Sequence, residues 1–174
     1  SSAVYPAYFI MKMLMEAGLP PGVINFVPGS GGEVGDPALD SEHLAGIHFT
    51  GSTSTFHAMW QRVGTNIERY RSYPRLVGET GGKDFIFAHP SADVEALVVA
   101  MLRGAFEYQG QKCSAASRAY IPESLWPKVK ERMGDELAQM KMGDPADFWN
   151  FINAVIDKGA YESIKDYIDY ARTG

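Results

Sequence analysis

Short apolar runs alternate with amphipathic stretches of helical length along this chain, and that alternation restricts its possible folds more than any other feature. Strand-like runs occur at 23–27, 45–49, 74–77, 84–88 and 118–121. Apolar residues recur at helical spacing at 3–17, 53–65, 93–107, 123–140 and 161–172. Strands joined through crossover helices predict an α/β fold with a largely parallel sheet.

Two helix starts carry recognisable capping residues. Ser52 precedes the expected helix at 53–65, and Asp93 is the capping residue at the start of the expected helix at 93–107. The second helix places Leu97 and Val98 on an apolar face. A change of composition near residues 78–83 predicts a boundary between two lobes, 1–78 and 79–174.

Composition narrows the classes of partner. The 174 residues carry a net charge of −5, with lysine and arginine scattered along the chain, so a nucleic acid is not an expected partner. Uninterrupted apolar stretches are too short to cross a bilayer, so we expect no membrane partner. The four histidines show no metal-ligand spacing, and we expect no metal site. The single cysteine indicates a reducing compartment.

That cysteine, Cys113, stands among small and polar residues rather than in an apolar run. A nucleophilic thiol needs access and help with ionisation. Gly110 and Ala115 leave space for a substrate, and the Lys112 cation favours the thiolate. The alternative is an inert packing cysteine.

Phe49, Thr50, Gly51 and Ser52 occupy the point where a strand gives way to a helix. Free backbone N–H groups and the helix dipole at such a junction suit a phosphate group. Ser52 could instead serve only as a helix cap. The glycine-rich turn that contains Gly31 could line a cofactor or be a simple turn, and it lacks the G-x-G-x-x-G fingerprint.

Glu79 lies between glycines, in the run Gly-Glu-Thr-Gly-Gly-Lys at 78–83. A carboxylate in such a loop can reach a substrate or a water molecule. The alternative is a solvated loop residue.

Taken in order, Phe-Thr-Gly-Ser at 49–52, the run at 78–83 and Gly-Gln-Lys-Cys at 110–113 resemble the aldehyde dehydrogenase superfamily. Residues 73–83 and 103–115 resemble its Δ1-pyrroline-5-carboxylate dehydrogenases, in the stand-alone eukaryotic form of fungal type. This resemblance implies NAD-dependent oxidation of L-glutamate 5-semialdehyde to L-glutamate in proline catabolism.

The resemblance also implies roles for single residues. Cys113 would be the nucleophile and Glu79 the general base that activates water. Ser114 and Lys112 would border the small aldehyde substrate, with Ser114 nearer its carboxylate. The residues that would lie along NAD are Gly31, Phe49, Thr50, Gly51, Ser52, Thr80 and Gly81.

By the same resemblance, residues 1–78 are the C-terminal part of an NAD-binding domain and 79–174 the N-terminal part of a catalytic domain. The parent enzyme would be a homo-oligomer in the mitochondrial matrix, with the cytoplasm as the alternative location. The family's oxyanion-hole asparagine and parts of its cofactor grip would lie outside this stretch, so we expect the isolated chain to be inactive. Two alternatives stay open: an inactive association module, and an aldehyde dehydrogenase for another semialdehyde.

Overall fold

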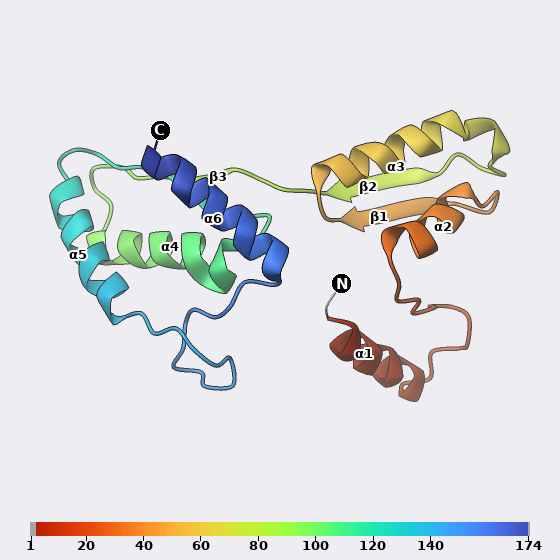
Figure 1. Cartoon of the computed structure of the whole chain (residues 1–174), viewed down its shortest axis with the longest axis horizontal. Helices are drawn as coiled ribbons and strands as arrows, with labels where there is room; N and C mark the ends of the chain where they lie inside the picture. Colours follow the sequence, from red (N-terminus) through yellow and green to blue (C-terminus); the bar gives the residue numbers. More distant parts are fainter. Residues whose placement is uncertain (1–2, 174) are drawn as a thin grey trace. The chain divides into compact units, whose positions relative to one another are not determined.

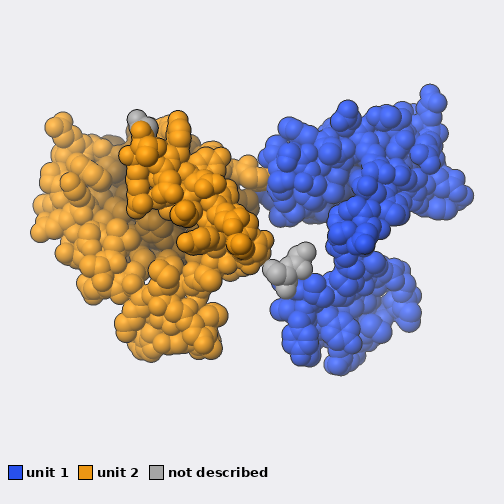
Figure 2. All heavy atoms as spheres, viewed as in Figure 1, with its two compact units in different colours: residues 1–79 blue, residues 80–174 orange. Residues whose placement is uncertain are grey.

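The computed structural model describes residues 3–173 and divides into two compact units (Figures 1 and 2). The division falls between Glu79 and Thr80. Each unit contains one parallel pair of strands with a helix between them in sequence. This arrangement confirms the α/β class expected from the alternating pattern.

Unit 1 is built on strands β1 (Gly46–Thr50) and β2 (Arg75–Glu79), which pair in parallel from Gly46 opposite Arg75 to Thr50 opposite Glu79. Helix α3 (Thr53–Thr65) connects them, followed by the single turn η2 (Ile67–Arg69). Phe56 of α3 stacks on Phe49 of β1 with ring centroids 6.0 Å apart. These aromatic rings attach the helix to the strand pair.

A short helix precedes the strands of unit 1. A π-turn, η1 (Gly31–Gly35), leads into α2 (Asp36–Asp40), a region that the sequence left without a defined structure. Arg62 of α3 binds Asp36 at 2.9 Å and donates through Nε to Asp40 at 2.9 Å. The hydrogen bonds from Arg62 lower the pKa of Asp40.

The first helix, α1 (Val4–Glu16), ends before Gly18, whose φ of +97° suits a helix stop. The expected strand at 23–27 is wrong, because this segment pairs with no strand among the described residues. Val23 and Val27 are exposed there. An apolar run becomes a strand only where a neighbouring strand accepts its backbone hydrogen bonds.

Unit 2 contains strands β3 (Asp84–Phe87) and β4 (Ala116–Tyr120), again parallel, with helix α4 (Val94–Phe106) and the turn η3 (Glu107–Gly110) between them. The Asp93 carboxylate accepts a hydrogen bond from the Ala96 N–H at 2.8 Å, as the cap prediction requires. The core of this unit consists of Ala88, Leu97, Val98, Met101, Leu102 and Val129.

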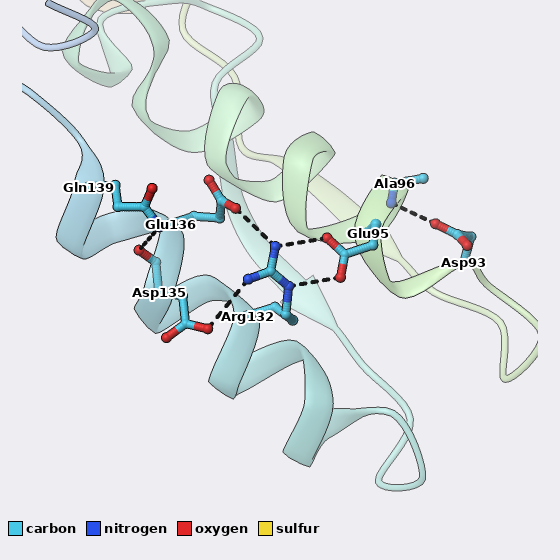
Figure 3. A network of polar contacts seen from close by, with 7 residues as sticks. All are labelled: Asp93, Glu95, Ala96, Arg132, Asp135, Glu136 and Gln139. Carbon is cyan, nitrogen blue, oxygen red and sulfur yellow. Dashed lines mark hydrogen bonds and ion pairs between the residues drawn. The ribbon is translucent and has the colours of Figure 1, made fainter.

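Helix α5 (Trp126–Gln139) packs on α4, with Val129 fully buried. Figure 3 shows the polar contact beside this core, where the Arg132 guanidinium binds both oxygens of Glu95 at 2.8 and 3.0 Å. Hydrogen bonds from Arg132 lower the pKa of Glu95. The ion pair joins the two helices at their solvent-facing edge.

After α5 the chain forms an irregular segment, residues 141–157, and ends in α6 (Lys158–Thr173). Met142 and Ile152 form an isolated parallel bridge inside this segment. Gly143, Asp144 and Pro145 lie in this segment outside any helix. The final helix begins three residues before the expected position, since Asp157 accepts a hydrogen bond from the Ala160 N–H at 2.8 Å.

Candidate active site

Cys113 lies in an exposed turn between η3 and β4. The turn is closed by a hydrogen bond from the Ala115 N–H to the Lys112 carbonyl at 3.2 Å. The Cys113 N–H donates to no group among the described residues. The residue can therefore be reached by a substrate, and its N–H has no competing acceptor among residues 3–173.

The backbone before this turn is left-handed at three successive residues. Tyr108, Gln109 and Gly110 have φ values of 52°, 56° and 68°. Glycine fits this conformation, and a Cβ at position 110 would lie 2.8 Å from the Ala105 carbonyl. The two non-glycine residues are strained, at a cost of about 1–3 kcal/mol each. Strain of this kind concentrates at functional sites.

Glu107 binds the lysine beside the cysteine. Lys112 Nζ lies 2.5 Å from Glu107 Oε2, and Arg103 donates to Glu107 Oε1 at 2.7 Å. These two cations lower the pKa of the Glu107 carboxyl, with Lys112 the larger cause. The Lys112 ammonium is thus paired with the Glu107 carboxylate. The sequence did not reveal this pair, because the five-residue spacing crosses a non-helical turn.

The loop after β2 passes against the cysteine. A Cβ at Gly82 would lie 2.5 Å from the Cys113 carbonyl oxygen, so the two backbones are in close contact. Thr80 is half-buried, and Gly81 and Ser114 are exposed. Unit 2 therefore brings the loop at 80–83 and the nucleophile candidate together.

Glu79 is the last residue of β2 in unit 1, not a loop residue, and its side chain is exposed. Its backbone carbonyl accepts a hydrogen bond from the Gly51 N–H at 3.1 Å. Thr50 lies directly opposite Glu79 in the strand register. Unit 1 therefore brings the Glu79 backbone and the turn at 49–52 together at the carboxyl ends of β1 and β2. Parallel sheets bind their ligands at this end.

The turn at 49–52 has the features of a phosphate site. Ser52 caps α3, since its Oγ accepts a hydrogen bond from the Thr55 N–H at 3.2 Å. The N–H groups of Thr53 and Ser54 find no acceptor within residues 3–173, and the first turn of α3 holds no acidic residue. Free N–H groups at a helix start attract a phosphate. Gly31 stands elsewhere, exposed at the start of η1.

A cavity of about 520 Å³ opens beside the cysteine turn in unit 2. Arg103, Tyr108 and Lys112 line one side, and residues 148–151 with Asn153 line the other. The Asn153 Oδ1 atom is buried and finds no hydrogen-bond partner among residues 3–173. No local sequence pattern predicts that this segment returns to the cysteine turn.

Within residues 3–173 we find no group of three histidine, cysteine, aspartate or glutamate side chains placed to hold a metal ion. None of the helices in this range has the length and apolar character needed to span a bilayer.

Comparison with known proteins decides the family. The whole sequence, residues 1–174, matches the aldehyde dehydrogenase family. The chain belongs to this family. A mitochondrial Δ1-pyrroline-5-carboxylate dehydrogenase from Mus musculus is 51% identical over 173 residues, 99% of this chain and 31% of that protein. Its counterpart from Dictyostelium discoideum is 52% identical over 174 residues, with the same coverage.

The fold has solved counterparts among aldehyde dehydrogenase structures. The NAD-bound Δ-pyrroline-5-carboxylate dehydrogenase from Mycobacterium tuberculosis superimposes with a TM-score of 0.92 and 54% sequence identity, over 97% of this chain and 31% of that one. The chain thus spans about a third of the length of the relatives it matches. The likeness does not single out the fungal form of the enzyme.

Proposed function

We propose that this aldehyde dehydrogenase chain belongs to an NAD-dependent Δ1-pyrroline-5-carboxylate dehydrogenase, which oxidises L-glutamate 5-semialdehyde to L-glutamate in proline catabolism. One observation carries this proposal: an exposed cysteine, held by a strained turn, has its backbone against the loop that follows Glu79. The names of the relatives at about 50% identity supply the substrate.

Cys113 would act first. Its thiolate attacks the aldehyde carbon and forms a thiohemiacetal, whose oxyanion accepts a hydrogen bond from the Cys113 N–H. This N–H has no competing acceptor in the described part of the chain, which supports the assignment. NAD, when bound, supplies the acceptor for the hydride that leaves the carbonyl carbon, and a thioester remains on Cys113.

Glu79 would then remove a proton from the water molecule that hydrolyses the thioester, which releases the acid and the free thiol. The covalent chain supports this role whatever the arrangement of the two units. Only three residue steps separate Glu79 from Gly82, so their Cα atoms stay within about 11 Å. Gly82 in turn contacts Cys113.

The family resemblance assigns NAD contacts to residues within each unit. The turn at Phe49, Thr50, Gly51 and Ser52 fits a pyrophosphate, because the first N–H groups of α3 find no acceptor in the described part of the chain and no acidic side chain stands in its first turn. Thr80 and Gly81 would lie near the nicotinamide, and Gly31 would lie along the cofactor on the side of η1. These are the positions that the family resemblance assigns.

The substrate would lie beside the exposed Ser114, whose hydroxyl would donate a hydrogen bond to the substrate carboxylate. Lys112 would also lie beside the substrate. Its ammonium would stay paired with Glu107 and would attract the substrate carboxylate by its positive charge. Both residues flank the nucleophile, so they would select for an aldehyde that carries a carboxylate.

At the level of the whole enzyme, we assign residues 1–78 to the NAD-binding domain and 79–174 to the catalytic domain. The chain divides one residue later, between Glu79 and Thr80, which supports this assignment. A homo-oligomer in the mitochondrial matrix is our working proposal. The mitochondrial relatives from Mus musculus and Dictyostelium discoideum support the location.

The test is NADH formation by the full-length parent protein with glutamate semialdehyde and with simple aliphatic aldehydes. We expect faster turnover of glutamate semialdehyde and no turnover after Cys113→Ala, whereas Ser117→Ala, an exposed β4 hydroxyl, should leave the rate unchanged. A preference for aliphatic aldehydes would contradict the substrate, and an active Cys113→Ala variant would contradict the mechanism.

A further inference from the structure

Gln111 is joined through its side-chain amide to two parts of unit 2 that are far apart in sequence. Its Nε2 donates to the Tyr108 carbonyl at 3.2 Å, and its Oε1 accepts a hydrogen bond from the Ile156 N–H at 2.9 Å. The backbone N–H of Gln111 donates to the same Tyr108 carbonyl at 3.1 Å. Gln111 thus supplies hydrogen-bond partners to two backbone groups. One is the carbonyl of Tyr108, the first left-handed residue of the turn, and the other is the N–H of Ile156, 45 positions away.

This amide holds the turn in a conformation that its residues do not prefer. Tyr108 and Gln109 are left-handed although both carry a Cβ, which disfavours that region of backbone space. Two donors from Gln111 converge on the Tyr108 carbonyl, and they fix the orientation of the peptide that begins the strained pair. Cys113 follows only two residues after Gln111, so relaxation of the turn would rotate its thiol.

The second bond joins the irregular segment 141–157 to the cysteine turn. Within the described residues, Ile156 finds no other acceptor for its N–H. The same segment contributes Phe148, Trp149 and Asn153 to the wall of the cavity beside Lys112. The side-chain oxygen of Gln111 therefore attaches the end of this segment to the turn that carries the nucleophile.

We propose that Gln111 is a positioning residue that fixes Cys113 for attack by locking the left-handed turn and attaching segment 141–157 to it. This inference rests on the proposed function, in which Cys113 is the nucleophile. Gln111 itself touches no reacting atom. Its removal acts through the orientation of Cys113, and a misplacement of about 1 Å can lower a rate about 100-fold.

The experiment uses two variants of the full-length parent enzyme. Gln111→Met keeps the length of the side chain and removes both side-chain hydrogen bonds. Gln111→Glu keeps an acceptor for the Ile156 N–H and loses the side-chain donor to the Tyr108 carbonyl. The matched control is Gln139→Met, because Gln139 makes a local bond to the Asp135 carbonyl on α5. We measure kcat, KM, the rate of Cys113 alkylation by iodoacetamide and Tm.

We expect kcat and the alkylation rate of both Gln111 variants to fall about 10- to 100-fold, with KM and Tm close to those of the control. Gln109→Gly in the Gln111→Met background should restore part of the lost rate, because glycine adopts the left-handed conformation without a steric penalty. A purely structural role would not show this rescue.

Wild-type kcat and alkylation in Gln111→Met would overturn the proposal, as would a loss that Gln109→Gly fails to restore. A Gln111→Glu variant at the wild-type rate would overturn the role of the Tyr108 bond. Alkylation needs no dehydrogenase activity. It therefore reports on Gln111 even if Cys113→Ala retains turnover and the proposed function fails.

Discussion

Gly82 has no space for a side chain, because its Cα faces the carbonyl oxygen of Cys113. In Gly82→Ala the new Cβ would start 2.5 Å from that oxygen, and the cysteine turn would have to move. We expect kcat of the parent enzyme to fall about 10- to 100-fold, as for other small displacements of a reacting group.

Gly134→Ala provides the control for this change, since nothing lies within 4 Å of a Cβ at that position on α5. Alanine should there be neutral or slightly stabilising. Equal rates for Gly82→Ala and wild type would show that the two backbones are not in contact in the working enzyme.

The ion pair of Arg132 with Glu95 makes a prediction about pH. Because the folded protein lowers the pKa of Glu95 below its ordinary 4.5, the pair contributes stability above about pH 4.5 and loses it as pH falls through the lower folded value. Arg132→Met should therefore lower Tm more at pH 7 than at an acidic pH where Glu95 of the folded protein has become protonated. Thermal unfolding of both proteins across this range measures the difference, and a pH-independent loss would contradict it.

Single residues with a local cause could be predicted from sequence. Ser52 and Asp93 cap their helices because capping depends on the next three residues alone. The pairing of Lys112 with Glu107 could not be predicted, since it depends on three left-handed residues between them. The role of Gln111 likewise depends on Ile156, which no local pattern connects to it.

At the scale of elements, helix α4 is the support on which the cysteine turn is built. Leu102 is buried in the core between α4, β3 and α5, only five residues before Glu107. Leu102→Ala should destabilise the parent enzyme by about 2–5 kcal/mol, the usual cost of such a cavity. Val99→Ala, on the exposed face of the same helix, is the control and should cost far less.

Denaturant unfolding with a probe in the catalytic domain measures both variants. A cost for Leu102→Ala no larger than that for Val99→Ala would contradict the assigned core.

Elements with a regular period were predicted closely. The amphipathic patterns at 53–65 and 93–107 appear as α3 (Thr53–Thr65) and α4 (Val94–Phe106). The apolar run at 23–27 failed, because a strand requires a neighbour that the local sequence does not specify. The π-turn at 31–35 has no periodic signal and was not foreseen.

At the scale of the whole molecule, the chain spans about a third of the length of its relatives. Residues 3–173 expose large aromatic side chains and unpaired strand edges. Phe148 and Trp149 are 96% and 83% exposed beside the cavity, and Tyr73 is 85% exposed. Each strand pair leaves two outer edges without a partner strand in the described part of the chain. Edges and apolar surfaces of this kind require cover in a stable protein.

The central claim, that Cys113 carries the acyl group and Glu79 releases it, has a direct test in the full-length parent. Glu79→Gln keeps the size of the side chain and removes the base, so the thioester should accumulate when NAD and glutamate semialdehyde are added. Mass spectrometry of the denatured protein should then show a glutamyl adduct, mapped to the peptide that contains Cys113. No adduct, or an adduct on another residue, would contradict the account.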